Sequence, residues 1–215
     1  MSQGDKSFWD RSATAYSQSK VSDERGYQRT LAATRSYLGP GDRVLELGCG
    51  TGSAAFVLAP SVASYLATDL SSEMIRIANE KRGSGSNPDV PPGLVFRAAT
   101  AEDVARSRAR FDAVLAYNYL HLVRDPWATV AAIRDVLGHG GVFISKTACV
   151  GDANPLMRWV VLPAMQAVGR APHVSKFTGA ELKRRIQEAG FEILAEEVHA
   201  SKGDDGRLFV VARRK

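Results

Sequence analysis

The sequence predicts an α/β fold in which a mostly parallel β-sheet carries helices on both faces. Strand-like and helix-like segments alternate through most of the 215 residues, and this alternation is typical of parallel strands joined by crossover helices. One apolar strand runs directly into a glycine-rich loop, from Gly48 to Gly52. Near the end of the sequence two apolar segments lie too close together for a helix to connect them, so we expect an antiparallel hairpin at one edge of the sheet.

Five short apolar segments, each bounded by glycine, proline or polar residues, are the expected parallel strands. They are Arg43 to Leu47, Ala63 to Thr68, Leu94 to Ala98, Phe111 to Tyr117 and Gly141 to Lys146. The hairpin is expected to pair Phe191 to Val198 with Leu208 to Ala212, around a turn at residues 203–206. The stretch from Gly83 to Gly93, rich in glycine, serine and proline, is an expected surface loop.

Two of the expected helices carry clear start and stop signals. Asp125 precedes a proline at the first helical position, and an apolar face then continues until Gly138, which predicts a helix between them. Thr178 begins a capping box, and Gly190 is the expected stop of that helix.

The composition indicates one globular domain over residues 1–215, with a helical cap over residues 1–40. Hydrophobic residues make up 45% and charged residues 24%, which is ordinary for a soluble domain. The net charge of +5 comes from scattered basic residues, so we expect no nucleic-acid surface. The beginning of the sequence lacks the apolar centre of a signal peptide, and no apolar run approaches the ~20 residues of a membrane span. Cys49 and Cys149 lack metal or redox spacing, and we expect a cytoplasmic protein.

The glycine loop and the acid that follows it predict a site for an adenosine-containing ligand. Glycine at 48, 50 and 52 permits positive φ and lets a ligand lie against bare backbone. Asp69 ends the next strand, where a carboxylate can accept hydrogen bonds from a ribose diol. The spacing is G-x-G-x-G rather than the G-x-G-x-x-G of dinucleotide sites, and Glu46 precedes it. A carboxylate there would repel a pyrophosphate and suits the cationic amino group or sulfonium of S-adenosylmethionine.

These motifs resemble a known family. E-L-G-C-G-T-G followed by T-D-L-S is similar to the first two signature regions of class I S-adenosylmethionine-dependent methyltransferases, especially the small-molecule group that includes quinone methyltransferases. The segments F-D-A-V, L-H-L-V-R-D-P and L-G-H-G-G-V-F-I look like the family's fourth strand, following helix and fifth strand. The resemblance implies a Rossmann-like seven-stranded sheet of order 3-2-1-4-5-7-6 with the last strand antiparallel.

The residues of the loop region and the resemblance together predict a set of residues that contact the cofactor, S-adenosylmethionine. The set is Tyr16, Glu46, Gly48, Gly50, Gly52, Asp69, Leu70, Ala101, Glu102 and Tyr117. Within it, the glycines line the methionine part, Asp69 holds the ribose, Leu70 packs on the adenine, and Ala101 with Glu102 lies at the adenine edge. Thr100 stands where the family often has aspartate. Tyr16 resembles a tyrosine that closes over the methionine end, an ordinary packing aromatic being the alternative.

The expected reaction needs few catalytic groups. Methyl transfer from a sulfonium is an in-line displacement in which the protein mainly aligns the nucleophile, excludes water and sometimes removes a proton. His121, after the fourth strand, is the candidate general base because its ordinary pKa suits proton removal at neutral pH; a structural histidine is the alternative. No segment typical of DNA methyltransferases and no paired acids of a metal site occur, which favours a small, partly apolar substrate and no metal.

Residues 150–177 replace a simple connection after the fifth strand. Their apolar residues, interrupted by Pro163, predict a lid over the substrate; a helix packed on the core or a homodimer contact are the alternatives. Two other functions stay open at this point. One is a non-catalytic S-adenosylmethionine-binding regulatory protein, and the other is a nicotinamide-dependent oxidoreductase, which the loop spacing and Glu46 disfavour.

Overall fold

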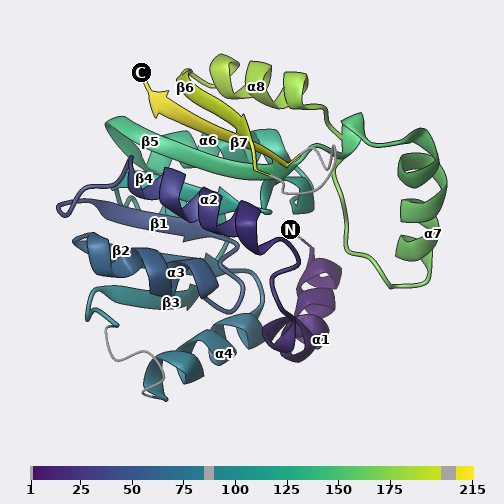
Figure 1. Cartoon of the computed structure of the whole chain (residues 1–215), viewed down its shortest axis with the longest axis horizontal. Helices are drawn as coiled ribbons and strands as arrows, with labels where there is room; N and C mark the ends of the chain where they lie inside the picture. Colours follow the sequence, from purple (N-terminus) through teal and green to yellow (C-terminus); the bar gives the residue numbers. More distant parts are fainter. Residues whose placement is uncertain (1, 85–89, 200–206) are drawn as a thin grey trace.

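The computed structural model contains a seven-stranded sheet of order β3-β2-β1-β4-β5-β7-β6 (Figure 1). It describes residues 2–84, 90–199 and 207–215. Neighbouring strands from β3 to β5 are parallel, whereas β7 runs antiparallel to both β5 and β6. The predicted α/β sheet, its strand order and its antiparallel terminal pair are therefore confirmed.

The strands match the apolar segments of the sequence closely. They are β1 (Arg43–Leu47), β2 (Ser64–Asp69), β3 (Leu94–Ala98), β4 (Phe111–Tyr117), β5 (Leu137–Ala148), β6 (Phe191–Val198) and β7 (Arg207–Arg214). The central strands are buried on both faces, as expected for parallel strands covered by two helical layers.

Helices cover both faces of this sheet. They are α1 (Gln3–Gln18), α2 (Glu24–Arg35), α3 (Ser53–Leu58), α4 (Ser72–Gly83), α5 (Ala101–Arg106), α6 (Pro126–Val136), α7 (Leu162–Ala167) and α8 (Gly179–Glu188). Short 3-10 turns occupy Ala59–Ser61, Leu120–Leu122 and Val150–Asp152, and a π-helical turn occupies Met157–Val161 just before Pro163. Asp125 and Thr178 cap α6 and α8 through their side chains, as predicted.

Alternating side chains of the strands divide the core into two apolar layers. Leu45, Val114 and Phe143 pack with residues of α5, α6 and α8 on one face. Val44 and Leu115 pack with residues of α2, α3 and α4 on the other. The period of two along each strand thus sends neighbouring residues to opposite layers.

The predicted start of the fifth strand was wrong. The fifth strand begins at Leu137 rather than Gly141, so the glycine at 138 lies within β5 and does not act as a helix stop. An irregularity in the pairing of β4 with β5, between Phe111 and Ala113, accommodates the extra residues. The end of α4 at Gly83 coincides with the predicted start of the surface loop. Part of that loop and the expected hairpin turn at 203–206 lie outside the described residues.

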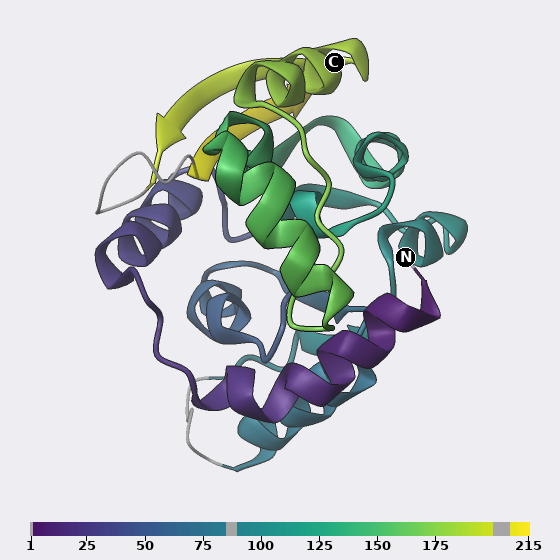
Figure 2. The same ribbon diagram turned by 90° about the vertical axis from the view of Figure 1, so that its right-hand side faces the viewer.

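Helix α1 and the α7 segment lie at the same end of the molecule. Figure 2 shows this side, with α1 in purple and the α7 segment in green facing the viewer. Helix α1 packs along α4 through a small apolar cluster of Ala13, Met74 and Ile77. The glycine loop reaches the same end, because Tyr16 of α1 lies against Gly50.

None of the helices in the described ranges is both long enough and apolar enough to span a bilayer.

Candidate active site

The loop after β1 has the backbone conformation that its glycines predict. Gly48, Gly50 and Gly52 adopt φ values of +70°, +54° and +85°, a region that residues with a Cβ rarely occupy. A Cβ at Gly48 would lie 2.5 Å from Cδ2 of Tyr119, and one at Gly52 would lie 2.7 Å from Cε1 of Phe96. Both glycines are therefore required for close packing of aromatic rings as well as for the turn.

Asp69, at the end of β2, is tied to the glycine loop. The backbone N–H of Gly50 donates to one carboxylate oxygen at 3.0 Å, and the N–H of Ser71 donates to the other at 2.8 Å. Burial raises the pKa of Asp69, and these two amide hydrogen bonds oppose that shift. The carboxylate is thus fixed beside the loop, and each of its oxygens has further acceptor capacity.

Glu46 lies under the loop on β1. Its side chain is buried, and the hydroxyl of Tyr65 on β2 donates to Oε2 at 2.9 Å. Burial raises the pKa of Glu46 to about 7, the Tyr65 hydrogen bond opposes this shift, and the charge of Asp69 adds to it. Glu46 therefore changes its charge near neutral pH, where a cationic ligand would favour the ionised form.

Tyr16, in the last turn of α1, covers the middle of the loop. A Cβ built at Gly50 would lie 3.2 Å from Cε1 of Tyr16. Tyr16 is 50% exposed; the part of the ring that lies against the loop is shielded from solvent, which raises the pKa of the phenol, and the charges of Asp69 and Glu46 add to this rise. The structure therefore brings Tyr16, Glu46 and Asp69 together around Gly50, although they lie on three different elements.

Two polar contacts hold α1 over this site. Asp10 accepts hydrogen bonds from the Ser71 hydroxyl at 2.7 Å and the Glu73 N–H at 3.3 Å, at the start of α4. Asp5 is buried and accepts two hydrogen bonds from the guanidinium of Arg124, at 2.8 Å and 3.0 Å. Helix α1 thus bridges α4 and the segment after β4.

The predicted adenine side lies around the start of α5. Ala101 is buried, and a Glu102 carboxylate oxygen accepts from the Thr129 hydroxyl at 3.3 Å. Thr100 has a structural role, because its hydroxyl caps α5 by accepting from the Asp103 N–H at 3.2 Å. Leu70 is partly buried between β2 and α4.

Tyr119 is a site residue that the sequence did not assign to the cofactor. Its ring packs on Gly48, and it is 6% exposed. Burial raises the pKa of its phenol, and the charges of Glu102 and Asp69 add to this rise. Tyr119 therefore lies between the glycine loop and the predicted adenine side. The signal that the sequence offered was its position two residues after β4. In the structure the preceding residue, Asn118, adopts a φ of 51°.

Two more residues of the predicted site lie at the end of β4 or just after it: Tyr117 is the last residue of the strand, and His121 follows four positions later. The hydroxyl of Tyr117 makes a 2.6 Å hydrogen bond with the Thr34 hydroxyl on α2, so its polar atom is engaged in helix packing. Atom Nδ1 of His121 is buried and has no hydrogen-bond partner. Burial lowers the pKa of His121 to about 4, and the positive charge of Arg207 contributes. The imidazole is therefore neutral at pH 7, with an unsatisfied nitrogen.

The 150–177 segment leaves the sheet and returns to the same point. The Gly151 N–H donates to the Phe177 carbonyl at 2.8 Å, and the Gly179 N–H donates to Asp152 at 2.7 Å. The segment between these closures exposes a set of large apolar side chains. They are Leu156, Met157, Trp159, Val160, Met165 and Val168.

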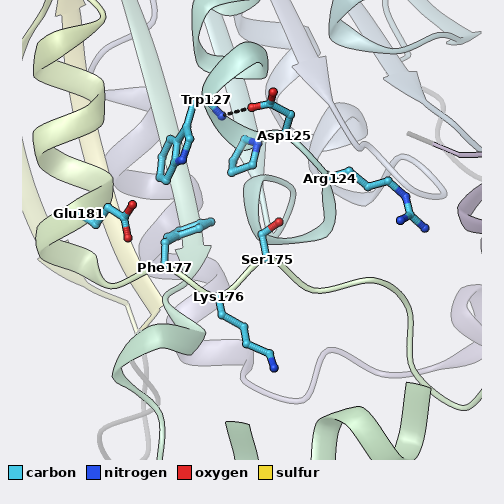
Figure 3. Close-up of a pocket in the computed structure, with 8 residues that line it drawn as sticks. Arg124, Asp125, Trp127, Ser175, Lys176, Phe177 and Glu181 are labelled. Atoms are coloured by element: carbon cyan, nitrogen blue, oxygen red, sulfur yellow. Dashed lines mark hydrogen bonds between the residues drawn. The ribbon is translucent and has the colours of Figure 1, made fainter. Parts of the chain in front are cut away.

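The base of this segment also forms a shallow hollow of about 250 Å³ (Figure 3). Arg124, Trp127, Lys176, Phe177 and Glu181 are among its lining residues. The ring centroids of Trp127 and Phe177 lie 5.2 Å apart, and the backbone N–H of Trp127 donates to the Asp125 carboxylate at 3.2 Å. No residue of the predicted cofactor set lines this hollow, so it is separate from the glycine-loop site.

The residues described contain no cluster of acids, histidines or cysteines arranged to hold a metal ion. Within the same ranges both cysteines are buried free thiols.

Comparisons with known proteins agree with the predicted family. A family model described as a methyltransferase domain matches residues 20–196. A ubiquinone biosynthesis O-methyltransferase of Cereibacter sphaeroides is 32% identical over 145 residues, which are 62% of this chain and 55% of the relative. One from Xanthomonas campestris pv. campestris is 33% identical over 109 residues, which are 50% of this chain and 44% of the relative. The chain thus spans about half the length of the curated relatives it matches.

Solved structures share the fold. Magnesium protoporphyrin IX methyltransferase from Synechocystis PCC 6803, with bound SAH, superposes with a TM-score of 0.72 and 18% identity over 98% of this chain and 100% of that chain. The cyclase SpnF superposes with a TM-score of 0.68 and 19% identity over 88% of this chain and 80% of that chain. Such distant likenesses show the fold, whereas the family match rests on sequence. The chain belongs to the methyltransferase domain family, and its expected place among the class I S-adenosylmethionine-dependent methyltransferases is confirmed.

Proposed function

We propose that this protein transfers a methyl group from S-adenosylmethionine to a small, partly apolar molecule. The observation that carries this proposal is the convergence of Asp69, Glu46 and Tyr16 around the positive-φ glycine loop. Two carboxyl groups of different environment suit a ligand that has a ribose diol at one end and a cationic amino acid at the other.

The residues present fit this ligand. Asp69 would accept the ribose hydroxyls with the acceptor capacity that its two amide contacts leave free. Glu46 would face positive charge, and Tyr119 would pack between the loop and the adenine end. Leu70, Ala101 and Glu102 remain the proposed adenine contacts. When bound, S-adenosylmethionine supplies a methyl carbon that its positive sulfur already activates.

The acceptor is proposed to bind beside His121. Its neutral ring has an unpartnered Nδ1 that can hydrogen-bond a polar group of the substrate and so position it. The proposed acceptor atom is oxygen, which the O-methyltransferase names of the curated relatives also suggest, and we place it on a phenol-like ring. The apolar residues of the 150–177 segment are proposed to cover that ring and exclude water.

The proposed reaction takes place in the cytoplasm. Two buried free thiols in the described part of the chain suit a reducing compartment.

Calorimetric titration with S-adenosylmethionine, followed by an assay for release of S-adenosylhomocysteine with a panel of phenols, tests the function. Asp69→Ala should weaken cofactor binding by about 2–4 kcal/mol, the scale of losing charge-assisted hydrogen bonds. Titration with NADH is the control and should give no heat of specific binding. Unchanged affinity of the Asp69→Ala variant would contradict the proposed site, and binding without turnover of any phenol would favour a non-catalytic role.

A further inference from the structure

A lysine is buried beneath the first turns of α2. Lys146, near the end of β5, is 5% exposed. Its Nζ donates to the Gly26 carbonyl at 3.2 Å and to the Thr30 hydroxyl at 3.0 Å. Burying an ammonium group is costly unless the group has a function or a counter-charge, so this position calls for a reason.

The hydrogen bonds continue from Lys146 to the surface. Thr30 Oγ1 lies 3.1 Å from Nδ1 of His199, and Nε2 of His199 lies 3.1 Å from Oε2 of Glu197. His199 is fully buried and stacks on Phe209 at 4.2 Å between ring centroids. The side chain of Glu197 is 39% exposed and pairs with Arg29 at 2.5 Å. A continuous line of polar atoms thus joins a buried amine to a surface carboxylate.

The donor and acceptor properties of these groups determine which atom carries the hydrogen in each hydrogen bond of the line. An ionised Glu197 only accepts, so Nε2 of His199 carries the hydrogen between them and Nδ1 of the neutral ring accepts. The Thr30 hydroxyl can then donate to Nδ1 while accepting from Lys146. The same hydroxyl also lies 2.6 Å from the Gly26 carbonyl, so its rotation between two acceptors opens or closes the line.

The backbone of Lys146 adjoins the segment that leads from β4 to the proposed acceptor site. It pairs with Tyr117 across β4 and β5, and its carbonyl accepts from the Asn118 N–H at 2.7 Å, just before Tyr119 and His121. On the side of Lys146 that faces α2, its hydrogen-bond partner Gly26 is followed in the sequence by Tyr27. Burial raises the pKa of Tyr27 to about 12, and the nearby charge of Glu46 adds to this rise. Lys146 therefore lies between the end of β4 and the first turn of α2.

Burial and the charged groups around the line lower the pKa of both bases. Burial lowers the pKa of Lys146 to about 8, Arg207 on β7 lowers it further, and Asp23 before α2 opposes the shift. Burial also lowers the pKa of His199; Glu197 opposes this shift, while Arg29 and Lys146 add to it. An amine of this kind exchanges a proton near pH 8, whereas His121, with its pKa of about 4, holds a proton poorly.

We propose that Lys146 receives the proton of the acceptor hydroxyl and that Thr30, His199 and Glu197 conduct it to the surface. In this step the acceptor O–H bond breaks, the oxygen forms a bond to the methyl carbon, and the C–S electron pair returns to sulfur. The proton adds to the neutral Lys146 amine, which later releases it through the line to solvent. The step rests on the proposed function, whereas the proton line itself can be tested without it.

Hydrogen exchange of the Lys146 ammonium measures the line directly. In protein labelled with ¹⁵N-lysine, the Lys146→Met variant identifies the Nζ signal, and exchange with water is then followed by NMR. Thr30→Val keeps the shape of the side chain but removes the hydroxyl, and Thr30→Ser is the matched control. We expect exchange at least about tenfold slower in Thr30→Val than in Thr30→Ser, with similar melting temperatures. Equal exchange rates in the two variants would overturn the proton line.

A surface variant covers the case in which Thr30→Val does not fold. Glu197→Gln changes only the partly exposed end, and it too should slow exchange of the Lys146 ammonium several-fold because an amide is a poor proton acceptor. Exchange at the wild-type rate in Glu197→Gln would contradict the proposed exit.

Kinetics with catechol as the acceptor probe test the role of Lys146. The kcat of Thr30→Val should be about tenfold below that of Thr30→Ser, with the same KM for S-adenosylmethionine, and the wild-type kcat should rise through about pH 8. A kcat that is equal in the two variants would overturn the role of Lys146 in turnover. If wild-type protein binds the cofactor but does not methylate catechol, the phenol acceptor is wrong, while the exchange result still decides the line.

Discussion

Replacing Gly50 can distinguish two effects of a side chain in the loop, namely strain of the backbone and loss of the space that the ligand needs. Gly50 and Gly140 both have positive φ, +54° and +75°, so valine at either position should cost about 1–3 kcal/mol of stability. A Cβ at Gly140 meets nothing within 4 Å, whereas one at Gly50 faces Tyr16. We expect calorimetry to detect cofactor binding in Gly140→Val and none in Gly50→Val. Normal binding by a folded Gly50→Val variant would contradict the proposed loop geometry.

Glu46 should lower stability at neutral and alkaline pH. Its folded-state pKa is raised from 4.5 to about 7, so its favourable contribution is complete below pH 4.5 and is lost as pH rises through 7. Glu46→Gln keeps an acceptor for Tyr65 without the charge, and it should be more stable than wild type above pH 7 by up to about 3 kcal/mol. Urea unfolding at pH 4 and pH 8 checks this, and an equal difference at the two pH values would refute it.

His121 provides a test of acceptor positioning. His121→Ala should lower kcat by up to about 10²-fold, the scale of a misplaced substrate, with little change in cofactor affinity. Because the pKa of His121 is about 4, the contribution of this side chain to the rate should be constant from pH 6 to pH 8. A lower melting temperature without a kinetic defect would instead identify His121 as a packing residue.

Individual site residues could be predicted only where their spacing within one short stretch of sequence forms a motif. Gly48 to Gly52 and Asp69 lie in adjacent strand-loop units, so their spacing identified them, and the structure joins them through the Gly50 amide. Lys146 and His199 meet Thr30 across 116 and 169 positions of sequence. Separations of that size leave no local pattern. The sequence therefore offered no signal that joins His199 to Thr30.

Among the elements, α1 is held over the site by the pair of Asp5 and Arg124. Burial alone would raise the pKa of Asp5, but hydrogen bonds from Arg124 and Ser2 lower it to about 2. The pair therefore stabilises the fold above pH 4, and this contribution disappears as pH falls towards 2. Arg124 is half-exposed, so solvent screening limits the stabilisation to about 1 kcal/mol.

Loss of this pair should loosen α1. In Arg124→Ala, α1 should leave Tyr16 less firmly placed over Gly50, and the dissociation rate of S-adenosylmethionine should rise several-fold in stopped-flow fluorescence. Arg184→Ala, which removes an exposed pair with Glu188 on α8, is the matched control. Equal dissociation rates in the two variants would show that α1 does not retain the ligand.

Element boundaries were predictable where capping chemistry and apolar runs coincide. Asp125 and Thr178 carried sufficient information because an N-cap is a local hydrogen bond. The start of β5 was missed because Leu137 pairs with Phe111 on another strand. A tertiary contact, rather than the local glycine signal, decides that boundary.

For the molecule as a whole, the closure between Gly151 and Phe177 predicts that the sheet folds without the segment above it. Replacing residues 154–174 by a three-residue Gly-Ser-Gly link keeps Ser175, which donates to the Val123 carbonyl at 2.7 Å. We expect this protein to unfold in one cooperative transition and to bind cofactor within a few-fold of wild type, but to lose turnover of phenols. Retained turnover would mean that the segment does not cover the acceptor.

The strand order of the whole sheet needed more than local patterns. Composition and alternation predict parallel strands with helices, but they do not order them. The resemblance in the glycine loop supplied the order, and the short separation of β6 from β7 supplied the antiparallel end. The position of α1 across the carboxyl ends of the strands depends on side chains of α4 and the β4–α6 segment, and no single stretch of sequence encodes it.

The two amides that hold Asp69 also affect how binding divides into enthalpy and entropy. The Gly50 and Ser71 N–H groups fix the carboxylate before any ligand arrives, so this side chain has little rotational freedom left to lose. A ligand that offers two vicinal hydroxyls therefore meets a preorganised acceptor, and the gain from both hydrogen bonds is not reduced by ordering a flexible chain. Binding of the sugar should therefore be driven by enthalpy, and it should depend strongly on the positions of the two hydroxyls. A deoxyribose analogue should lose most of that enthalpy without recovering entropy.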